Sequence, residues 1–213
     1  ISSTGLIPVL KHFPGHGSVP ADSHQELPVQ TRSRAELEKV DLAPFAQAAD
    51  VGVAAIMVGH IDVRAIDPGV PSSLSHEVVT GVLRDQLGFD GLVVTDALDM
   101  AGVQDQHDSA SAAVAALKAG ADVLLMPPDT RDARDGIVAA VEDGSLDRSR
   151  LEQAATRLLA YLIHQEAQPL DTAAPGSRAE ASAELSAAAV TVVAGPCSGN
   201  LVEDGIRVLG SAD

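Results

Sequence analysis

Four short apolar runs divide the N-terminal part of the chain, and each is followed by a polar loop and then by a segment with helical spacing. The runs cover residues 6–10, 53–58, 92–95 and 123–126. Short runs of this kind are typical of strands that are buried on both faces, and strands that alternate with helices indicate parallel βα units. The last three runs start about one βα unit apart, as such a repeat requires.

Five helices are predicted between and after these strands. The first begins at the capping box Ser33-Arg34-Ala35-Glu36 and runs to about Ala49. The second begins after Ser75 and ends near Gly88, because glycine readily takes the left-handed conformation that ends helices. The remaining helices are expected at 109–119, at 131–142 and from about residue 148 onward. The last one carries an apolar stripe that should face the core: Leu151, Ala155, Leu158, Leu159 and Leu162.

Consecutive βα units fit either an open, doubly wound sheet or a closed barrel. None of the four predicted strands is followed by the pattern Gly-x-Gly-x-x-Gly, so the dinucleotide-binding open sheet loses support. Instead, polar residues that could act chemically follow three of the strands: Lys11 and His12, then His60, then Asp96. A TIM barrel places its active site at this carboxyl-terminal end of its strands, and four βα units make up half of such a barrel.

The composition narrows the classes of protein and partner. Of the 213 residues, 46% are hydrophobic but only 2% are aromatic, so Val, Leu, Ile and Ala must fill the core, as suits an α/β protein. The net charge of −16 argues against nucleic acid or an anionic membrane surface as a partner. No apolar run approaches the roughly 20 residues of a membrane span. The one cysteine, Cys197, excludes an intrachain disulfide and leaves the compartment undecided between the cytoplasm and export as a secreted protein or lipoprotein.

The segment from Lys11 to His24 concentrates the candidate chemistry. It reads Lys-His-Phe-Pro-Gly-His-Gly-Ser-Val-Pro-Ala-Asp-Ser-His. Ordering a loop costs backbone entropy, so catalysis or binding explains this many titratable groups better than packing does. A metal site is not expected, because His12 and His16 could share one face only in a helix, which Pro14 and Gly15 exclude.

Two motifs in this chain resemble those of glycoside hydrolase family 3, in particular its bacterial β-N-acetylglucosaminidase branch. The first is Lys11-His12-Phe13-Pro14-Gly15-His16-Gly17 followed by Asp22-Ser23-His24, and the second is Gly-Phe-Asp-Gly-Leu-Val-Val-Thr-Asp-Ala-Leu-Asp-Met at 88–100. The resemblance implies a (β/α)8 TIM barrel and places both motifs in its C-terminal half. Two positions depart from the family pattern: Ser18 stands where Asp is common, and Ala97 where many of these enzymes carry a second acid.

The same resemblance implies a domain organisation. Residues 1–166 correspond to the C-terminal half of the barrel, and residues 167–183, rich in Ala, Pro, Ser and charged residues, are interpreted as a linker. Residues 184–213, with predicted strands at 190–193 and 206–210, resemble the start of the α/β sandwich domain that follows the barrel in many family members. Because the chain opens at Ile1 directly into a predicted strand, it is interpreted as a fragment of a longer protein.

Asp96 is the candidate nucleophile. A retaining glycosidase needs a nucleophile and a proton donor, commonly two carboxyl groups about 5 to 5.5 Å apart. Asp96 ends an apolar strand and precedes Ala97-Leu98, so little water should surround it, and the resemblance assigns it the nucleophilic role. The alternative is an aspartate that caps the next helix. Asp99, close by, is interpreted as a cap or a surface group.

Asp22 and His24 are the candidate acid/base pair. A carboxylate that binds one ring nitrogen of a histidine fixes its tautomer and leaves the other nitrogen to give and take a proton. The resemblance implies that His24 has this catalytic role and that Asp22 orients it. The alternative is a solvated loop histidine beside a turn residue.

The other histidines and Lys11 receive different roles. The resemblance implies that Lys11 and His12 bind sugar hydroxyl groups. His16 lies between two glycines and is expected to shape the loop, whereas His60 is interpreted as a structural hydrogen-bonding residue rather than a ligand.

These assignments predict a retaining β-N-acetylhexosaminidase that needs no cofactor. It would release terminal β-linked N-acetylglucosamine from a glycan such as a peptidoglycan or chitin fragment, through a glycosyl-aspartate intermediate. One alternative is a phosphorylase that uses the same residues, because a neutral imidazole does not repel phosphate. Another is a non-catalytic barrel remnant that binds sugar or scaffolds a partner.

Overall fold

A computed structural model of the chain describes residues 6–167 and 176–189. Contacts divide the chain into two compact units, Ile1–Leu170 and Asp171–Asp213. The first unit holds the α/β fold, and the described part of the second is the helix α7, Ala179–Ala189. Within the described residues, no helix has both the length and the apolar character needed to cross a membrane.

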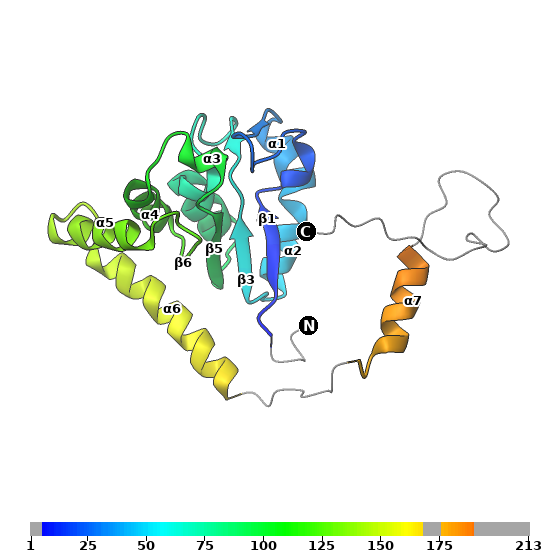
Figure 1. Cartoon of the computed structure of the whole chain (residues 1–213). Coiled ribbons are helices and arrows are strands. Elements are labelled where there is room, and N and C mark those ends of the chain that lie inside the picture. Colours follow the sequence, from blue (N-terminus) through cyan, green and yellow to red (C-terminus); the bar gives the residue numbers. More distant parts are fainter. Residues whose placement is uncertain (1–5, 168–175, 190–213) are drawn as a thin grey trace, which may run out of the picture. The chain divides into compact units, whose positions relative to one another are not determined.

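The first unit is built on a four-stranded parallel sheet. Its strands are β1 (Val9–Phe13), β3 (Ala55–Val58), β5 (Leu92–Ala97) and β6 (Val123–Leu125), in the spatial order β1-β3-β5-β6. Figure 1 shows α1 and α2 beside β1, and α4, α5 and α6 on the side of β6. The structure confirms the predicted α/β class and the βα repeat, which is the TIM-barrel type with about half of a barrel present.

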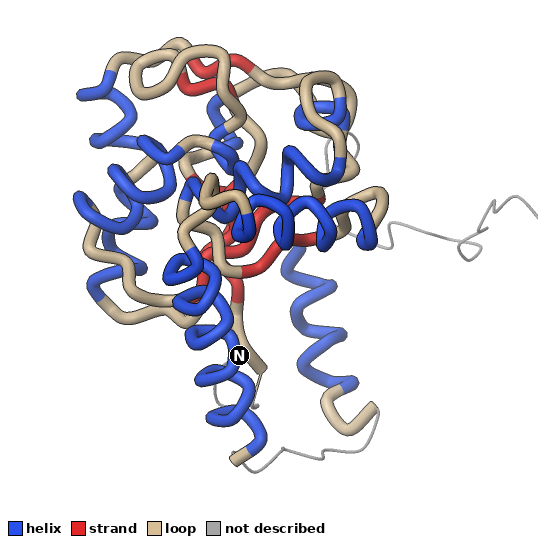
Figure 2. The backbone as a smooth tube through the Cα atoms, turned by 90° about the vertical axis from the view of Figure 1, so that its left-hand side faces the viewer, coloured by secondary structure: helices blue, strands red, loops and turns tan. Residues whose placement is uncertain are grey.

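A second, two-stranded sheet was not predicted. It pairs β2 (Val29–Gln30) with β4 (Asp62–Val63) in parallel, and Figure 2 shows these short strands apart from the main sheet. A strand of two residues has no apolar run or alternation that would distinguish it from a loop. The small sheet joins the segment after the histidine loop to the segment after β3.

Helices connect the strands, and several of their ends follow from the sequence. The capping box is formed, with the Ser33 hydroxyl and the Glu36 carboxylate each bonded to the other residue's backbone N–H, and Gly120 ends α4 in the left-handed conformation. The first two predicted helices contain π-helical turns. The helical segments are η2 (His16–Ser18), α1 (Arg34–Glu36), η3 (Leu37–Asp41), α2 (Ala43–Asp50), η4 (Ser72–Leu74), η5 (Glu77–Gln86), α3 (Ala101–Gln104), α4 (Ser109–Ala119), α5 (Thr130–Glu142) and α6 (Arg148–Glu166).

The core lies between the sheet and these helices and is mostly aliphatic, as the composition predicts. The few aromatic residues it holds are buried, and the rings of Phe13 and Phe45 meet edge-to-face with centroids 5.1 Å apart. Representative members of the main apolar cluster are Leu37, Ile56, Val58, Val79, Leu83, Phe89, Val93 and Leu98.

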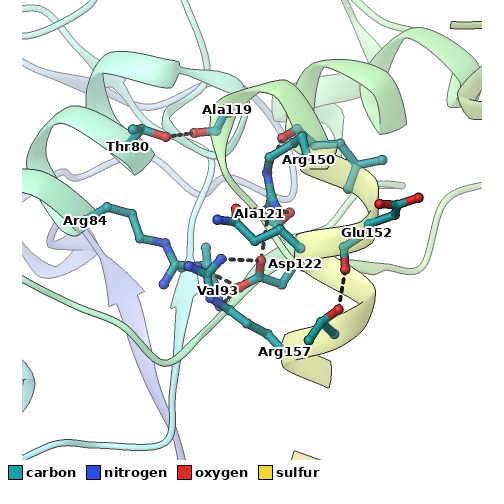
Figure 3. A network of polar contacts seen from close by, with 12 residues as sticks. Thr80, Arg84, Val93, Ala119, Ala121, Asp122, Arg150, Glu152 and Arg157 are labelled. Carbon is teal, nitrogen blue, oxygen red and sulfur yellow. Dashed lines mark hydrogen bonds and ion pairs between the residues drawn. The ribbon is translucent and has the colours of Figure 1, made fainter. Parts of the chain in front are cut away.

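A buried polar network fixes the amino-terminal end of the sheet. Asp122, just before β6, accepts a hydrogen bond from the backbone N–H of Val93 in β5 at 3.0 Å. Its carboxylate also pairs with three guanidinium groups, those of Arg84, Arg150 and Arg157, at 2.6, 3.0 and 3.2 Å. Figure 3 shows how these side chains converge from η5 and α6 on Asp122. The network therefore ties two strands to two helices.

Two predicted elements are wrong in part. The first strand is Val9–Phe13 rather than residues 6–10, because pairing with β3 begins only at Val9. The apolar stripe of α6 does not face the core as a whole: none of its five residues is fully buried, and Ala155, Leu159 and Leu162 are exposed. Only the first turns of α6 pack on α4 and α5, and the rest extends past them (Figure 1).

The domain boundaries stay a prediction. Helix α7 begins at Ala179, inside the stretch that was predicted to be a linker, so that part of the linker is helical. An alanine-rich segment favours a helix even where no apolar period is visible. The predicted strands at 190–193 and 206–210 lie outside the described residues.

Candidate active site

Asp96 is the penultimate residue of β5 rather than the first residue after it. Its side chain is 14% exposed. One carboxylate oxygen, Oδ1, accepts the backbone N–H of Ala97 at 2.9 Å, and the other, Oδ2, lies 3.4 Å from Nε2 of His12. The structure thus places a largely buried carboxylate at the carboxyl end of an inner strand, where parallel α/β proteins carry their active sites.

His12 reaches Asp96 from the carboxyl-terminal end of β1, which is separated from β5 by β3. Burial lowers the pKa of His12 below its ordinary value, and the negative charge of Asp96 opposes this shift only in part. The ring is therefore neutral near pH 7. Lys11 is exposed, and both residues border an open cavity of about 370 Å³ that also touches His16. Lys11 and His12 lie inside the strand, not after it as predicted.

Asp22 and His24 form the pair that the sequence predicts. Oδ1 of Asp22 lies 2.7 Å from Nδ1 of His24 and also accepts the His24 backbone N–H at 3.0 Å. The backbone hydrogen bond first, and then the ring, lower the pKa of Asp22, so this carboxylate is ionised at neutral pH. The two side chains are 54% and 74% exposed. This geometry fixes the ring through Nδ1 and leaves Nε2 as the nitrogen available for proton transfer.

The structure therefore brings the predicted residues together as two pairs, His12 with Asp96 and Asp22 with His24. No hydrogen bond or ion pair between described residues joins one pair to the other. The two pairs are instead linked through His16, whose ring meets the His12 ring edge-on with centroids 6.0 Å apart and whose Nε2 lies 2.8 Å from the hydroxyl of Ser23. Both pairs therefore adjoin the same loop histidine.

Ser23 anchors the exposed pair to the body of the protein. Unlike its two neighbours, it is buried, and its hydroxyl lies 2.8 Å from Nε2 of His16. Its carbonyl accepts the backbone N–H of Gly102 in α3 at 3.4 Å. A side chain at Gly102 would come within 3.3 Å of that carbonyl, so glycine allows the loop to lie close to α3. This contact of His16 with Ser23 joins two parts of the loop, which agrees with the prediction that His16 shapes it.

A second anchor was not predicted from the sequence. Nη1 of Arg32 donates to the hydroxyl of Ser18 at 2.7 Å and to Oδ2 of Asp41 at 2.6 Å, and the Ser18 hydroxyl donates to Oδ1 of Asp41. Asp41 ends the π-helical turn η3, and its side chain is 3% exposed. The sequence does contain one signal for this anchor. Asp41 is an acid on the buried side of the first predicted helix, and a buried carboxylate almost always has a polar partner.

Gly15 is expected to be a sensitive position in this loop. Its φ of 124° lies in the left-handed region, and an added Cβ would sit 2.7 Å from Cβ of Asp41. Gly15→Ala should therefore lower the free energy of unfolding by about 1–3 kcal/mol and displace the turn. Thermal unfolding of the full-length protein would measure this loss. Gly17→Ala is the matched control, because a Cβ added there would have nothing within 4 Å; equal stability of the two variants would contradict the prediction.

His60 is fully buried and makes two hydrogen bonds. Its Nε2 donates to the carbonyl of Ala97 at 2.9 Å, so Nδ1 accepts from the hydroxyl of Ser73 at 2.7 Å. Burial lowers the pKa of His60, which keeps the ring neutral. These are the contacts of a structural residue that holds the end of β5. Within the described residues, no three His, Cys, Asp or Glu side chains are grouped so as to hold a metal ion.

The sequence is similar to known proteins over most of its length. Residues 1–161 match the family described as glycosyl hydrolase family 3 N terminal domain. The beta-hexosaminidase of Chromobacterium violaceum is 41% identical over 137 residues, which cover 64% of this chain and 38% of that relative. Beta-hexosaminidase A of Pseudoalteromonas piscicida is 33% identical over 220 residues, covering 90% of this chain and 36% of that relative.

The fold is also similar to solved structures. A glycoside hydrolase family 3 beta-N-acetylglucosaminidase from Paenibacillus sp. str. FPU-7 aligns with a TM-score of 0.76 and 36% identity, covering 82% of this chain and 34% of that one. The chain thus spans little more than a third of the length of these relatives. The family match over residues 1–161, together with the half-barrel sheet, shows that the chain belongs to glycosyl hydrolase family 3 and contains part of its N-terminal domain.

Proposed function

We propose that the full-length protein is a retaining glycoside hydrolase that releases terminal β-linked N-acetylhexosamine. One observation carries this proposal: Asp96, 14% exposed at the end of β5, contacts His12, and His16 links His12 to the loop in which a carboxylate holds His24 at 2.7 Å. Relatives named beta-hexosaminidase and beta-N-acetylglucosaminidase support the choice of substrate class. The natural glycan is proposed to contain N-acetylglucosamine, as in peptidoglycan or chitin fragments.

The proposed reaction has two steps. In the first, the Asp96 carboxylate attacks the anomeric carbon, the bond to the leaving oxygen breaks, and Nε2 of protonated His24 gives its proton to that oxygen. In the second, neutral His24 takes a proton from water, which attacks the same carbon and releases Asp96. Two displacements at one carbon retain its configuration. Asp22 holds the His24 ring throughout.

Lys11 and His12 are proposed to bind the sugar. His12 contacts Asp96 directly, so a sugar seated above that carboxylate would also meet the His12 ring. Lys11 offers three N–H donors at the adjacent cavity, where sugar hydroxyl oxygens can accept them. Contacts to the sugar that strengthen as the sugar ring distorts would contribute to transition-state binding.

Removal of His24 should lower kcat/KM most for substrates whose leaving group needs a proton. For a disaccharide, whose leaving group is a sugar hydroxyl, kcat/KM of His24→Ala should fall about 10²–10⁴-fold. For a nitrophenyl N-acetyl-β-glucosaminide, whose leaving group departs without a proton, kcat/KM should fall far less. Asp22→Asn should also lower kcat/KM more on the disaccharide than on the nitrophenyl substrate, but by a smaller factor than His24→Ala. Steady-state kinetics of the full-length protein on both substrates would measure these ratios.

The controls separate the alternatives. His76→Ala removes another exposed histidine, at the start of η5, and should leave kcat/KM unchanged on both substrates. Equal losses on both substrates for His24→Ala would contradict the acid/base role. Sugar 1-phosphate as product when phosphate is added would assign a phosphorylase instead, and an inactive parent protein that still binds sugar would leave only a binding function.

A further inference from the structure

The loop that carries Asp22 and His24 is attached to the body of the protein not only at Ser23 but also at a second point, earlier in the loop. Asp22 and His24 are both mostly exposed, and within the described residues their strongest contacts are with each other. The turn His16–Ser18, earlier in the same loop, is by contrast fixed by the Arg32–Asp41–Ser18 contacts. We call these three residues the loop clamp.

The loop clamp is a closed set of hydrogen bonds. Each oxygen of the Asp41 carboxylate has its own donor, Ser18 on one side and Arg32 on the other, and Arg32 also bonds to Ser18. A carboxylate buried to this degree is stable only when such partners are present. Because Ser18 and Asp41 are 23 residues apart in the sequence, the clamp joins the loop to the helical segment η3.

The backbone of the loop also rests directly on Asp41. A Cβ on Gly15 would approach the Asp41 side chain to 2.7 Å, so the chain passes the carboxylate with no room for a side chain. Asp41 thus contacts both ends of the turn, at Gly15 and at Ser18. π-helical turns such as the one that Asp41 ends are frequent at functional sites.

A continuous path leads from the loop clamp to the acid/base pair. His16 lies between Gly15 and Ser18, and its Nε2 is 2.8 Å from the hydroxyl of Ser23. Ser23 is buried, and Asp22 and His24 are its direct neighbours. The His16 ring also meets the His12 ring edge-on, with centroids 6.0 Å apart. A shift of the turn would therefore move the pair that holds the catalytic proton.

We propose that Arg32, Asp41 and Ser18 are positioning residues, which act through His16 and Ser23 to hold His24 where it can reach the leaving oxygen. This inference rests on the proposed function, in which His24 is the acid/base. A misplacement of about 1 Å can cost about 10²-fold in rate, so a small movement of the loop is enough to affect the reaction.

The test uses the full-length protein and the mildest change. Ser18→Ala removes the link between the loop and Asp41 but leaves the Arg32–Asp41 ion pair, so the fold should persist. We expect kcat/KM on the disaccharide to fall about 10-fold or more, with the nitrophenyl substrate changed less than about 2-fold. Asp41→Asn should give a larger effect of the same kind, with a lower thermal stability. Glu38→Gln breaks the exposed Arg34–Glu38 pair on the same helical segment and is the matched control.

A double variant separates positioning from a purely structural role. In a His24→Ala background, Ser18→Ala should cause no further loss on the disaccharide, because the loop clamp then has no acid/base to position. Equal losses on both substrates, or a full additional loss in that background, would overturn the inference. If His24→Ala itself shows no selectivity for the disaccharide, the proposed function fails instead, whatever Ser18→Ala does.

Discussion

Asp96→Asn in the full-length protein is expected to lower turnover about 10⁴-fold or more. The amide cannot act as a nucleophile at the anomeric carbon, yet it has the size of the carboxylate and can still accept the Ala97 N–H. Folding should be unaffected, because the side chain's other polar contact is the 3.4 Å approach of His12. Steady-state kinetics beside thermal unfolding would show loss of activity without loss of structure.

The covalent intermediate gives a more direct measurement of the same assignment. In His24→Ala, a nitrophenyl substrate should still glycosylate the enzyme, but no base remains to activate water. The glycosyl-enzyme should therefore accumulate, and mass spectrometry of the quenched, digested protein should find the sugar on the peptide that contains Asp96. The adduct should be missing from the double variant with Asp96→Asn.

Asp99→Asn is the matched control for Asp96. Asp99 is exposed in the turn that follows β5, three residues further along the chain. Its replacement should leave turnover within about 2-fold, as is usual for surface substitutions away from special features. Loss of activity in Asp99→Asn with full activity in Asp96→Asn would show that the nucleophile had been assigned to the wrong acid.

Asp122→Asn is expected to destabilise the protein by about 3–5 kcal/mol. The change removes the one carboxylate that three guanidinium groups share, and an amide has a single oxygen to offer them. Figure 3 shows these three groups gathered around Asp122. Arg84, whose side chain is mostly buried, would lose its countercharge, and burial already lowers its pKa.

Unfolding of the full-length protein by heat and by urea would measure this loss. Arg148→Ala, which breaks the exposed Arg148–Glu152 pair on α6, should have little effect, because exposed ion pairs are screened by water. Activity per folded molecule should stay unchanged in Asp122→Asn, since this residue lies at the amino-terminal end of the strands and Asp96 at the other. A loss no larger than that of Arg148→Ala would contradict the structural role of the network.

The sequence alone determined the class of the fold and the identity of the main candidate residues. Short apolar runs with helical segments between them predict a parallel βα repeat, because strand and helix periodicity are local properties of the chain. The capping box at Ser33 begins a helix and the glycine at position 120 ends one, both through neighbouring backbone groups, so these helix ends were also predictable. The Asp22–His24 contact spans two residues and is local in the same sense.

Only the tertiary structure decided the contacts between distant parts of the chain. The His12–Asp96 approach depends on which strand lies beside which, and the loop clamp depends on where η3 packs against the loop. The Asp122 network joins segments that no sequence pattern connects, and the exposure of the last turns of α6 depends on where its neighbours end. A sequence pattern specifies which side of a helix or strand is apolar, but the residue that it meets there is set by register, twist and packing in three dimensions.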